Sequence, residues 1–540
     1  MPMPAGPVLV VGAGPTGLVA AALLGSRGVP TIVIERNPAT SDEPKAVTID
    51  DVALRTLQRA GIAGDVYPAL LQGTGTRYYG RRGQLLTYAH GHPPFRAGHP
   101  VKNPFQQPEL EAHLVRTLRR FPCVEVRFER ELTGLRQEAG QGARQEEGHD
   151  AGEVVAEVAG GEEIHASYVF GCDGGRSTVR SLLGLGMTGS SYQEPWLVVD
   201  TVNDPHDERY AMHHGDPRQP HLVVPGKDGN CRYEFLMKPE QVAPGAGPPP
   251  ELVRELVAPF RPLRDGDVKR AAIYTFHALV SERWQVGRCF LLGDAAHMMP
   301  PFAGAGLNTG IRDADNLTWK LDAVRAGAAR PELLETYEAE RRPYAEAMIR
   351  LSVRLGSIVM TRSRTRARVR DAAVGLANLV PPARRYLSDM RFRPEARYDR
   401  GFVLTGERGP AIVGRSLPQP TVTDACGCRT LLDDVLGPGF ALLAVDPAEP
   451  DPFGALDHPL WDRLGACRVA VALDDRAARP TDGSWRSVAD FDGLLLGPLA
   501  DCRGSVLVVR PDRFVAAAFP PSRQGEVADR LAAWLAGTAR

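Results

Sequence analysis

Hydrophobic and polar positions change period along the chain, and these changes predict the order of helices and strands. Near the N-terminus, continuous apolar runs predict buried strands at residues 8–11 and 31–34, with a helix at 16–27 between them. This order forms a βαβ unit. Apolar residues then recur with helical spacing at 50–60 and 108–120, which predicts two further helices.

The next stretch changes from alternation to a polar run. Residues 124–137 alternate as a single strand does, so one strand is expected there. Residues 138–153 are polar, charged and rich in glycine, which predicts an exposed hairpin tip or a disordered loop.

Short apolar runs separated by turns predict a β-rich region between about 185 and 285. Its expected strands lie at 196–202, 221–225, 231–239 and 271–278. A buried strand at 288–294 then precedes long helices that extend to about residue 390. From about residue 400 onward, the expected elements are strands at 440–445, 469–473 and 505–510 and a closing helix at 526–537.

Composition describes an ordinary globular protein. The 540 residues are 43% hydrophobic and 24% charged, which predicts about three domains. A net charge of -1 favours neither a nucleic acid nor an acidic membrane surface as a partner. No apolar run reaches the roughly 18–20 residues that span a bilayer, and the N-terminus lacks a basic leader, so a cytoplasmic location is expected. Of eight cysteines only Cys426 and Cys428 are close together, and C-x-C is neither a redox pair nor a zinc motif. No metal site is expected.

The sequence G-A-G-P-T-G at 12–17 follows a strand and opens a helix. Gly12 permits a tight turn, Gly14 lets a pyrophosphate approach the backbone, and Gly17 lets helix and strand pack closely. The N–H groups at the helix start favour an anion. Glu35, at the end of the next strand, is placed to accept hydrogen bonds from ribose hydroxyls. The motif therefore predicts a dinucleotide site.

A second motif, V-F-G-C-D-G-G-R-S-T-V-R, occupies 169–180. A buried strand ends at Asp173, two glycines turn the chain, and Ser177 is a plausible cap of the helix that follows.

The third motif, G-D-A-A-H-M-M-P-P-F-A-G-A-G-L-N-T-G at 293–310, joins a buried strand to a helix. Asp294 stands at the end of the strand, where its carboxylate can accept a ribityl hydroxyl. Pro301 and its preceding proline stiffen the turn. Gly304 and Gly306 would bring bare backbone up to a flat ligand, and a helix start near it would stabilise negative charge.

These three motifs, in this order and spacing, resemble the FAD-dependent aromatic hydroxylases. These enzymes are single-component flavoprotein monooxygenases with the p-hydroxybenzoate hydroxylase fold. The resemblance covers residues 7–360 closely. Within the family the chain most resembles the 3-(3-hydroxyphenyl)propionate hydroxylases, through stretches such as A-V-T-I-D-D-V-A-L-R-T-L-Q-R-A-G and N-P-F-Q-Q-P-E-L-E-A-H-L-V-R-T-L-R-R-F-P.

The resemblance implies an α/β fold with three domains. A Rossmann-type FAD-binding domain would comprise 1–75, 105–185 and 285–395, and an inserted β-rich substrate domain would comprise 76–104 and 186–284. Residues 400–540 resemble the thioredoxin-like C-terminal domain of larger members. Because its redox C-x-x-C is missing, a structural or dimer-contact role is expected, and with it a homodimer.

Carried over by position, the family's FAD contacts fall on residues of all three motifs and of the segments between them. The expected contacts are Gly12, Gly14, Pro15, Thr16, Gly17, Glu35, Arg36, Lys45, Gln107, Asp173, Asp294, Pro301, Gly304, Gly306, Leu307 and Asn308. Lys45 stands where the family usually has arginine, which keeps the charge but loses the bidentate fork. The carbonyl of Pro301 is expected to face the substrate ring.

The family's reaction implies NADH or NADPH as the reductant of FAD, and O2. Addition of O2 to the reduced flavin then implies a flavin C4a-hydroperoxide, which transfers OH to a phenolic ring. Asp50 has two interpretations: an acid that polarises the phenol, or the N-cap of the helix that follows. Arg232, Tyr233 and Tyr274 are expected substrate contacts. Strand alternation places Arg232 and Glu234 on one face and Tyr233 on the other, so at most one of these sets faces the pocket. His297 is expected to pack or hydrogen-bond within the flavin loop.

Three functions remain open at this point. The first is hydroxylation of a meta-substituted phenol such as a hydroxyphenylpropionate-like acid. The second is hydroxylation or oxygen insertion on an aromatic polyketide or antibiotic by the same fold. The third is flavin binding without turnover.

Overall fold

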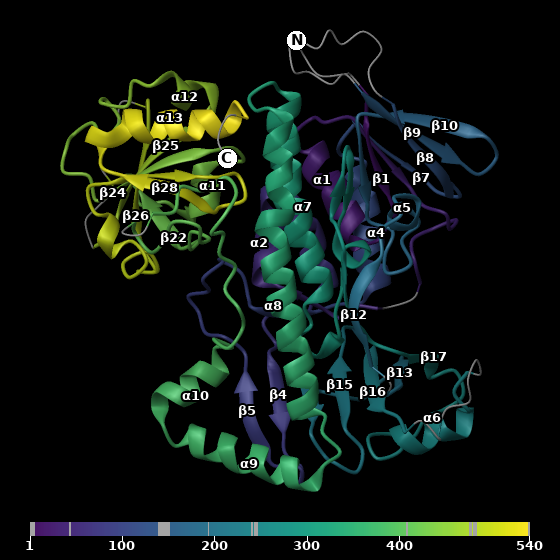
Figure 1. Cartoon of the computed structure of the whole chain (residues 1–540). Helices are drawn as coiled ribbons and strands as arrows, with labels where there is room; N and C mark the ends of the chain where they lie inside the picture. Colours follow the sequence, from purple (N-terminus) through teal and green to yellow (C-terminus); the bar gives the residue numbers. More distant parts are fainter. Residues whose placement is uncertain are drawn as a thin grey trace.

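Three regions surround the long helix α8 (Thr336–Val359) in the computed structural model (Figure 1). The structure describes residues 6–42, 45–138, 152–192, 194–238, 241, 247–406, 409–474, 478 and 483–537. An α/β region contains the N-terminal strand β1 (Val8–Val11), and a β-rich region lies toward the other end of α8. The C-terminal region lies on the opposite side of α8 from β1 (Figure 1).

A six-stranded sheet forms the centre of the α/β region. Its order is β19-β20-β11-β1-β2-β7, and all neighbours are parallel except β19 and β20. The strands are β2 (Thr31–Ile34), β7 (Val124–Arg127), β11 (Tyr168–Gly171), β19 (Gln285–Val286) and β20 (Cys289–Leu291). Helix α1 (Pro15–Gly25) packs against α4 (Gln107–Leu118) and α7 (Gly306–Arg325). The predicted βαβ unit is confirmed, because its continuous apolar runs are buried on both faces.

The prediction of one strand at 124–137 is wrong. The structure has two strands there: β7 in the central sheet, and β8 (Leu132–Glu138) in a three-stranded sheet with β9 (Glu153–Val158) and β10 (Glu162–Ala166). Glu129 turns the chain with a φ of 55°, and its N–H donates to the carbonyl of Asn37. The turn lacks glycine and proline, so alternation alone did not indicate the break. Of the predicted tip at 138–153, residues 139–151 lie outside the described part of the chain.

The β-rich region is built on a seven-stranded sheet with the order β17-β13-β16-β15-β14-β4-β5. These strands are β4 (Thr76–Tyr79), β5 (Leu85–Ala89), β13 (Trp196–Thr201), β14 (Ala211–His214), β15 (His221–Pro225), β16 (Cys231–Leu236) and β17 (Val268–Tyr274). One face buries an apolar core under α6 (Pro250–Val257). Two segments far apart in sequence therefore form a single sheet.

Short elements connect this sheet to the α/β region. A two-stranded ribbon pairs β3 (Thr48–Asp50) with β6 (Lys102–Pro104), and α2 (Asp51–Arg59) follows β3 directly. A small sheet joins β12 (Met187–Ser191), β18 (His277–Ser281) and β21 (His297–Met298). Beyond α8, helices α9 (Arg364–Asn378) and α10 (Pro381–Ser388) lie beside β5.

The C-terminal region has a sheet of the order β23-β22-β26-β25-β24-β27-β28. Its strands are β22 (Thr421–Asp424), β23 (Arg429–Leu431), β24 (Ala441–Val445), β25 (Cys467–Ala472), β26 (Arg486–Asp490), β27 (Val506–Val509) and β28 (Val515–Phe519). Helix α13 (Gln524–Leu535) closes the chain, as its apolar spacing predicted.

A buried ionic cluster joins the C-terminal region to α7 and α8. Arg510 donates to both oxygens of Glu340, at 2.9 and 2.7 Å, and to Asp512. Lys320 of α7 donates to Glu340 at 2.8 Å, and the side chains of Lys320, Glu340 and Arg510 are fully buried. Burying these charges would be costly unless the carboxylates and the cations of α7, α8 and the C-terminal region paired with one another.

Among the described residues, no helix is both long and apolar enough to cross a membrane.

Candidate functional site

The third motif forms a tight connection between β20 and α7. Two short 3-10 turns, Gly293–Ala295 and Pro301–Ala303, flank β21. Gly304 follows with a φ of 59°, and a Cβ there would lie 2.8 Å from the hydroxyl oxygen of Thr48. A residue other than glycine at this position would therefore have a strained backbone, and its side chain would clash with Thr48 of β3.

Asn308 fixes this connection against β3. Its side-chain nitrogen donates to the carbonyls of Gly304, at 2.8 Å, and Thr48, at 3.2 Å. Its side-chain oxygen accepts the N–H of Asp50 at 2.9 Å. The amide thus satisfies three backbone groups and holds the glycine turn and the strand in one fixed arrangement.

The first motif has the shape of an anion cradle. Gly12 has a φ of 104°, and a Cβ on Gly17 would lie only 2.1 Å from the carbonyl oxygen of Gly12. A Cβ on Gly14, in contrast, would meet no atom within 4 Å. Gly14 is the N-cap of α1 and offers no side-chain cap, and Pro15 opens the helix. The N–H groups of the first turn therefore face open space, where a diphosphate can approach.

Acidic and amide side chains surround this cradle. Glu35 accepts the N–H of Ala13 at 3.0 Å and the side-chain amide of Asn37 at 2.6 Å. The side chain of Thr16 points away from this open space, toward Gly293 and Gly310. A Cβ on Gly293 would lie 2.9 Å from its hydroxyl oxygen, and a Cβ on Gly310 would lie 2.4 Å from it. It packs α1 against α7.

Gln107 holds the segment that contains Lys45. Its carbonyl oxygen accepts the N–H groups of Lys45, at 3.0 Å, and Ala46, at 2.7 Å. Its nitrogen donates to Glu111 at 2.7 Å, and Glu111 accepts the N–H of Ser41 at 3.1 Å. The glutamine is buried and fixes the backbone of Lys45, and it is not among the described residues that line the two cavities reported below.

Asp173 organises the second motif. Its carboxylate accepts the hydroxyl of Ser177 at 2.5 Å and the N–H of Val179 at 3.0 Å. Ser177 in turn accepts the N–H of Arg180, which makes it the N-cap of α5 (Thr178–Leu182). The predicted cap is confirmed.

These motifs meet the seven-stranded sheet at one cavity of about 930 Å³, which we call the central cavity. Ten of the predicted site residues line it: Arg36, Lys45, Asp173, Arg232, Tyr274, Asp294, Pro301, Gly304, Gly306 and Leu307. Apolar walls come from both regions, among them Val198, Leu222, Val224, Ile273, Phe276 and Phe302. The lining therefore combines polar residues of the second and third motifs with apolar and polar side chains from the sheet.

The sheet presents one of its two faces to this cavity. Arg232 and Glu234 line it, and Arg232 forms a bidentate pair with Asp200 at 2.7 and 3.1 Å. Tyr233 lies on the opposite face, within the core under α6, and its hydroxyl donates to Asp204 at 2.9 Å. Tyr233 does not reach the cavity, which corrects its expected place among the substrate contacts.

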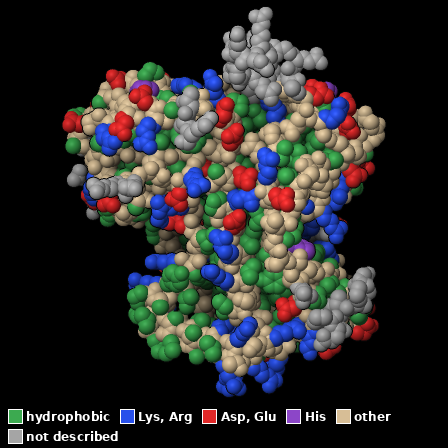
Figure 2. Space-filling view, in the orientation of Figure 1, with side chains coloured by type: hydrophobic (Ala, Val, Ile, Leu, Met, Phe, Trp, Pro, Cys, Tyr) green, Lys and Arg blue, Asp and Glu red, His purple; other side chains and the backbone are tan. Residues whose placement is uncertain are grey.

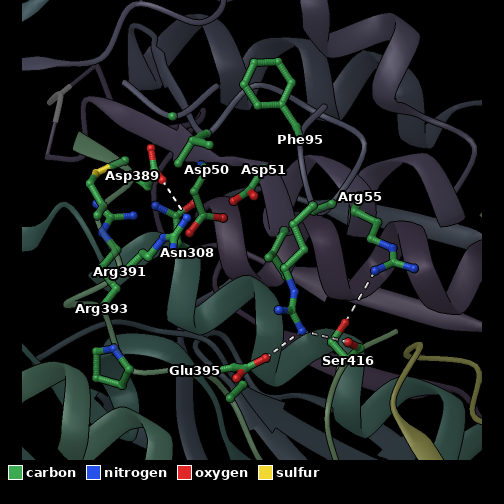
Figure 3. A pocket seen from close by; sticks show the side chains of 18 of the residues that line it. Asp50, Asp51, Arg55, Phe95, Asn308, Asp389, Arg391, Arg393, Glu395 and Ser416 are labelled. Carbon is green, nitrogen blue, oxygen red and sulfur yellow. Dashed lines mark hydrogen bonds and ion pairs between the residues drawn. The ribbon is translucent and has the colours of Figure 1, made fainter. Parts of the chain in front are cut away.

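A larger cavity, of about 1370 Å³, lies on the other side of the glycine turn, and we call it the arginine-lined cavity. Figure 3 shows Arg391 and Arg393 near Asn308 on one side of it, and Arg55 with Ser416 on the other. Nine arginines line it, and Gly304 and Ala305 border both cavities. Figure 2 shows Lys and Arg side chains near the indentation beside the C-terminal region.

Asp50 lines the arginine-lined cavity. One carboxylate oxygen accepts the N–H of Ala53 at 2.9 Å and caps α2, and the other accepts Arg312 at 2.8 Å. The predicted N-cap is therefore confirmed. Asp50 is absent from the described lining of the central cavity.

His297 has the packing role predicted for it. Its ring is fully buried against Trp284, and Nε2 lies 2.7 Å from Asp313. Asp313 also accepts Arg341 at 2.9 Å and the N–H of Gly293 at 3.1 Å. The histidine thus anchors the start of the third motif.

Asp204, His206 and Cys231 lie close enough to share a metal ion. However, Arg261 lies 3.3 Å from the carboxylate of Asp204, which also accepts the hydroxyls of Thr201 and Tyr233. Burial raises the pKa of the Cys231 thiol well above its usual value. A cation would compete with a resident guanidinium, so we assign no metal here.

Several residues that line the central cavity, notably Lys102 and His213, have no signal in the sequence pattern. Lys102 lies in a three-residue strand, too short to show any period, and His213 lies in a strand of four. Their position depends on pairing with distant strands, for which the local pattern has no signal.

Comparison with known proteins identifies the family. Residues 6–352 match the family described as FAD binding domain, and residues 414–534 match the HcaD C-terminal domain. A 3-(3-hydroxy-phenyl)propionate/3-hydroxycinnamic acid hydroxylase of Mycolicibacterium smegmatis is 38% identical, over 97% of this chain and 92% of that protein. The chain belongs to the FAD-dependent aromatic hydroxylase family. It is an enzyme, and FAD is its cofactor.

Two further proteins extend the match, one in sequence and one in fold. A hydroxylase of the same name from Burkholderia vietnamiensis is 36% identical, over 96% of this chain and 98% of its own length. An aklavinone-11 hydroxylase, solved with FAD and aklavinone, has a TM-score of 0.76 at 24% identity, over 98% of this chain and 99% of that chain. At this identity the structure supports the fold alone, whereas the curated hydroxylases support an aromatic substrate.

Proposed function

We propose that this aromatic hydroxylase adds one hydroxyl group to a phenol that carries a carboxylate side chain, of the 3-(3-hydroxyphenyl)propionate type. One oxygen atom of O2 enters the ring and the other leaves as water, with two electrons from NADH or NADPH. The observation that carries the proposal is the central cavity, because residues of the second and third motifs line it together with apolar side chains of the sheet. Full-length similarity to two hydroxylases of this name supports the substrate class.

We propose that FAD binds with its adenosine diphosphate at the first motif and its flavin in the central cavity. The open space at Gly14 and the free N–H groups of α1 suit the diphosphate, and Glu35 suits the adenosine ribose. Arg36, Lys45, Asp173 and Asp294 line the next part of the cavity, where we propose that they contact the phosphate and ribityl groups. Bound FAD supplies the redox chemistry and the activation of oxygen.

The remaining residues position the flavin ring and the phenol. We propose that the bare backbone of Gly304, Gly306 and Leu307 borders the flavin ring, and that the Pro301 carbonyl faces the phenol. Asn308 acts from behind, by holding this turn against β3.

Apolar side chains exclude water from the reacting ring. Phe276 and Phe302 contact each other edge to face, with ring centroids 5.9 Å apart, and Leu222 lies beside them in the cavity wall. A dry wall favours oxygen transfer to the ring over release of peroxide to solvent. Arg232 and Tyr274 are two of the polar side chains that the sheet presents to this cavity, and we propose that they orient the phenol.

We propose a positioning role for Asp50. Its carboxylate caps α2 and pairs with Arg312, and its N–H donates to Asn308, so its N–H and both carboxylate oxygens support the frame around the glycine turn. In the alternative interpretation it polarises the phenol. Asp50→Asn separates the two, because loss of a polarising acid changes the pH profile of kcat, whereas loss of a frame contact lowers kcat and FAD affinity at every pH.

We propose that the C-terminal region is thioredoxin-like and structural. The order β25-β24-β27-β28, with β24 parallel to β25, β27 antiparallel to both neighbours and α13 following, supports this fold. Its exposed Cys426 and Cys428 lack redox spacing. We further propose that it contributes to a homodimer, which light scattering of the purified enzyme tests.

Substrate-stimulated cofactor oxidation tests the proposed function. The purified enzyme is expected to retain FAD, to oxidise NADH or NADPH faster when 3-(3-hydroxyphenyl)propionate is added, and to release a product one oxygen atom heavier. Labelled O2 places the label in the product. Stimulation only by polycyclic aromatic ketones would instead favour the polyketide alternative, and stimulation by no aromatic compound would contradict both.

A further inference from the structure

Lys102 presents its side-chain amine to the central cavity without an acidic partner among the described residues. It occupies the first position of β6, opposite Asp50 in the ribbon. Its ammonium group donates to the hydroxyl of Thr76 on β4, and its side chain lines the cavity. No described carboxylate pairs with it, in contrast to Arg232, which Asp200 neutralises.

The groups around Lys102 leave this corner positive. His213 of β14 is buried beside it, and burial followed by the charge of Lys102 lowers its pKa far below the usual value, so it is neutral. The carboxylate of Asp50 on β3 forms an ion pair with Arg312 at 2.8 Å. Arg393, which follows α10, donates to the carbonyl of Ala303 and adds a second positive charge from the arginine-lined cavity.

The facing sheet does not cancel this charge. Glu234 lies 3.8 Å from Arg232, and burial raises its pKa. Burial, followed by the charge of Arg393, lowers the pKa of Lys102 to about 7. The surroundings of Lys102 therefore contain no described carboxylate that pairs with its ammonium group. Lys102 lines the same cavity as Pro301 and Tyr274.

We propose that Lys102 binds the carboxylate of the substrate and thereby selects phenolic acids over neutral phenols. This inference rests on the proposed function and names the group that recognises the acid. An anion at this corner would gain a charge-assisted hydrogen bond and would stabilise the charged lysine. The phenol ring would then extend from Lys102 toward Pro301, with its hydroxyl end under the sheet.

Two simpler roles make different predictions. If Lys102 only supported β4 through Thr76, its loss would affect acids and neutral phenols alike. If its neutral amine took the phenol proton, its loss would lower kcat for both kinds of substrate. A carboxylate partner instead changes the ratio of kcat/KM between an acid and its neutral analogue, chiefly through KM.

The test compares 3-(3-hydroxyphenyl)propionate with its methyl ester in three forms of the FAD-loaded enzyme: wild type, Lys102→Met and Lys269→Met. Lys269 is exposed on β17 of the same sheet, so its change is a matched loss of charge. The wild type and Lys269→Met are expected to favour the acid. In Lys102→Met the acid-to-ester ratio is expected to fall by about 10- to 100-fold, the range of a charged hydrogen bond.

The pH dependence gives a second readout. Because only the charged lysine binds a carboxylate, kcat/KM for the acid is expected to fall as pH rises through about 7. The ester is expected to lack this limb, and Lys102→Met to remove it for the acid. Flavin absorbance and thermal melting establish that each variant is folded and loaded.

Equal loss for acid and ester in Lys102→Met, or a wild type that does not distinguish them, would overturn the assignment of Lys102 and leave the hydroxylase function standing. If no phenol stimulates cofactor oxidation in the wild type, the proposed function itself fails.

Discussion

Replacing Glu340 by glutamine removes the negative charge that the buried ionic cluster depends on. The carboxylate accepts hydrogen bonds from Arg510, Lys320 and Asn316, and from the N–H of Phe402 at 2.9 Å. Burial alone would raise its pKa, but the charges of Arg510 and Lys320 lower it from 4.5 to about 2. Glu340→Gln would leave Lys320 buried beside a neutral amide, and Arg510 paired with Asp512 but without its second carboxylate.

Two estimates of the cost agree. Breaking a buried ion pair by neutralising one partner costs about 3–5 kcal/mol. The change of pKa from 4.5 to about 2 corresponds to about 3 kcal/mol at neutral pH. Because the pKa of the folded state is the lower one, this stability is present above pH 4.5 and is lost as pH falls through about 2.

Urea denaturation followed by tryptophan and flavin fluorescence measures the effect. Glu340→Gln is expected to lower the free energy of the transition that separates α8 from the C-terminal region by about 3 kcal/mol or more. Glu346→Gln, on the same helix, is the matched control, because Glu346 pairs with Arg342 and Arg350 only at 3.8 and 3.7 Å on the surface. That exposed contact is worth about 0–1 kcal/mol. Equal stability of the two variants at pH 7 would refute the reasoning.

Three further predictions concern the site. Gly14→Ala is expected to fold normally but to bind FAD more weakly, whereas Gly17→Ala is expected to destabilise the fold, since its Cβ would lie 2.1 Å from a carbonyl oxygen. Thermal melting and FAD titration distinguish the two variants, and equal melting temperatures would contradict this difference. Tyr233→Phe is expected to cost about 1 kcal/mol of stability with KM unchanged, because it removes one buried hydrogen bond. Tyr274→Phe is expected to alter kcat/KM instead. Steady-state kinetics and urea denaturation measure both effects, and a raised KM in Tyr233→Phe would contradict its buried position. Asp50→Asn is expected to keep the shape of the pH profile while lowering kcat and FAD retention, and a lost pH limb in kcat would restore the polarising role.

Local sequence determined the parts of the fold that depend on short-range chemistry. The strands of the βαβ unit were predicted with the bounds that the structure has, because continuous apolar runs next to glycine turns have few alternative structures. Alternation also separated Arg232 from Tyr233 correctly, since successive side chains of a strand face opposite sides.

The parts that depend on long-range pairing could not be predicted. Thr76 and Lys102 meet only because β4 joins the seven-stranded sheet and β6 pairs with β3. The split of 124–137 into two strands is fixed by contacts of Glu129 and Arg130 with the segment after β2, not by a turn residue. Local periodicity has no information on such partners, so the lysine in the cavity was recognised only from the structure.

Helix α8 has a consequence for exchanging parts between related enzymes. Near its start, Glu340 is enclosed by Arg510 of the C-terminal region, and near its end Gly356 lies so close to Phe302 that a Cβ would be 2.5 Å from the ring. A C-terminal region transplanted from a relative must therefore match the charges on this helix before it matches any outer surface. A mismatch there would disturb a helix that also packs against Phe302 in the wall of the central cavity, so α8 and the C-terminal region need to be exchanged together.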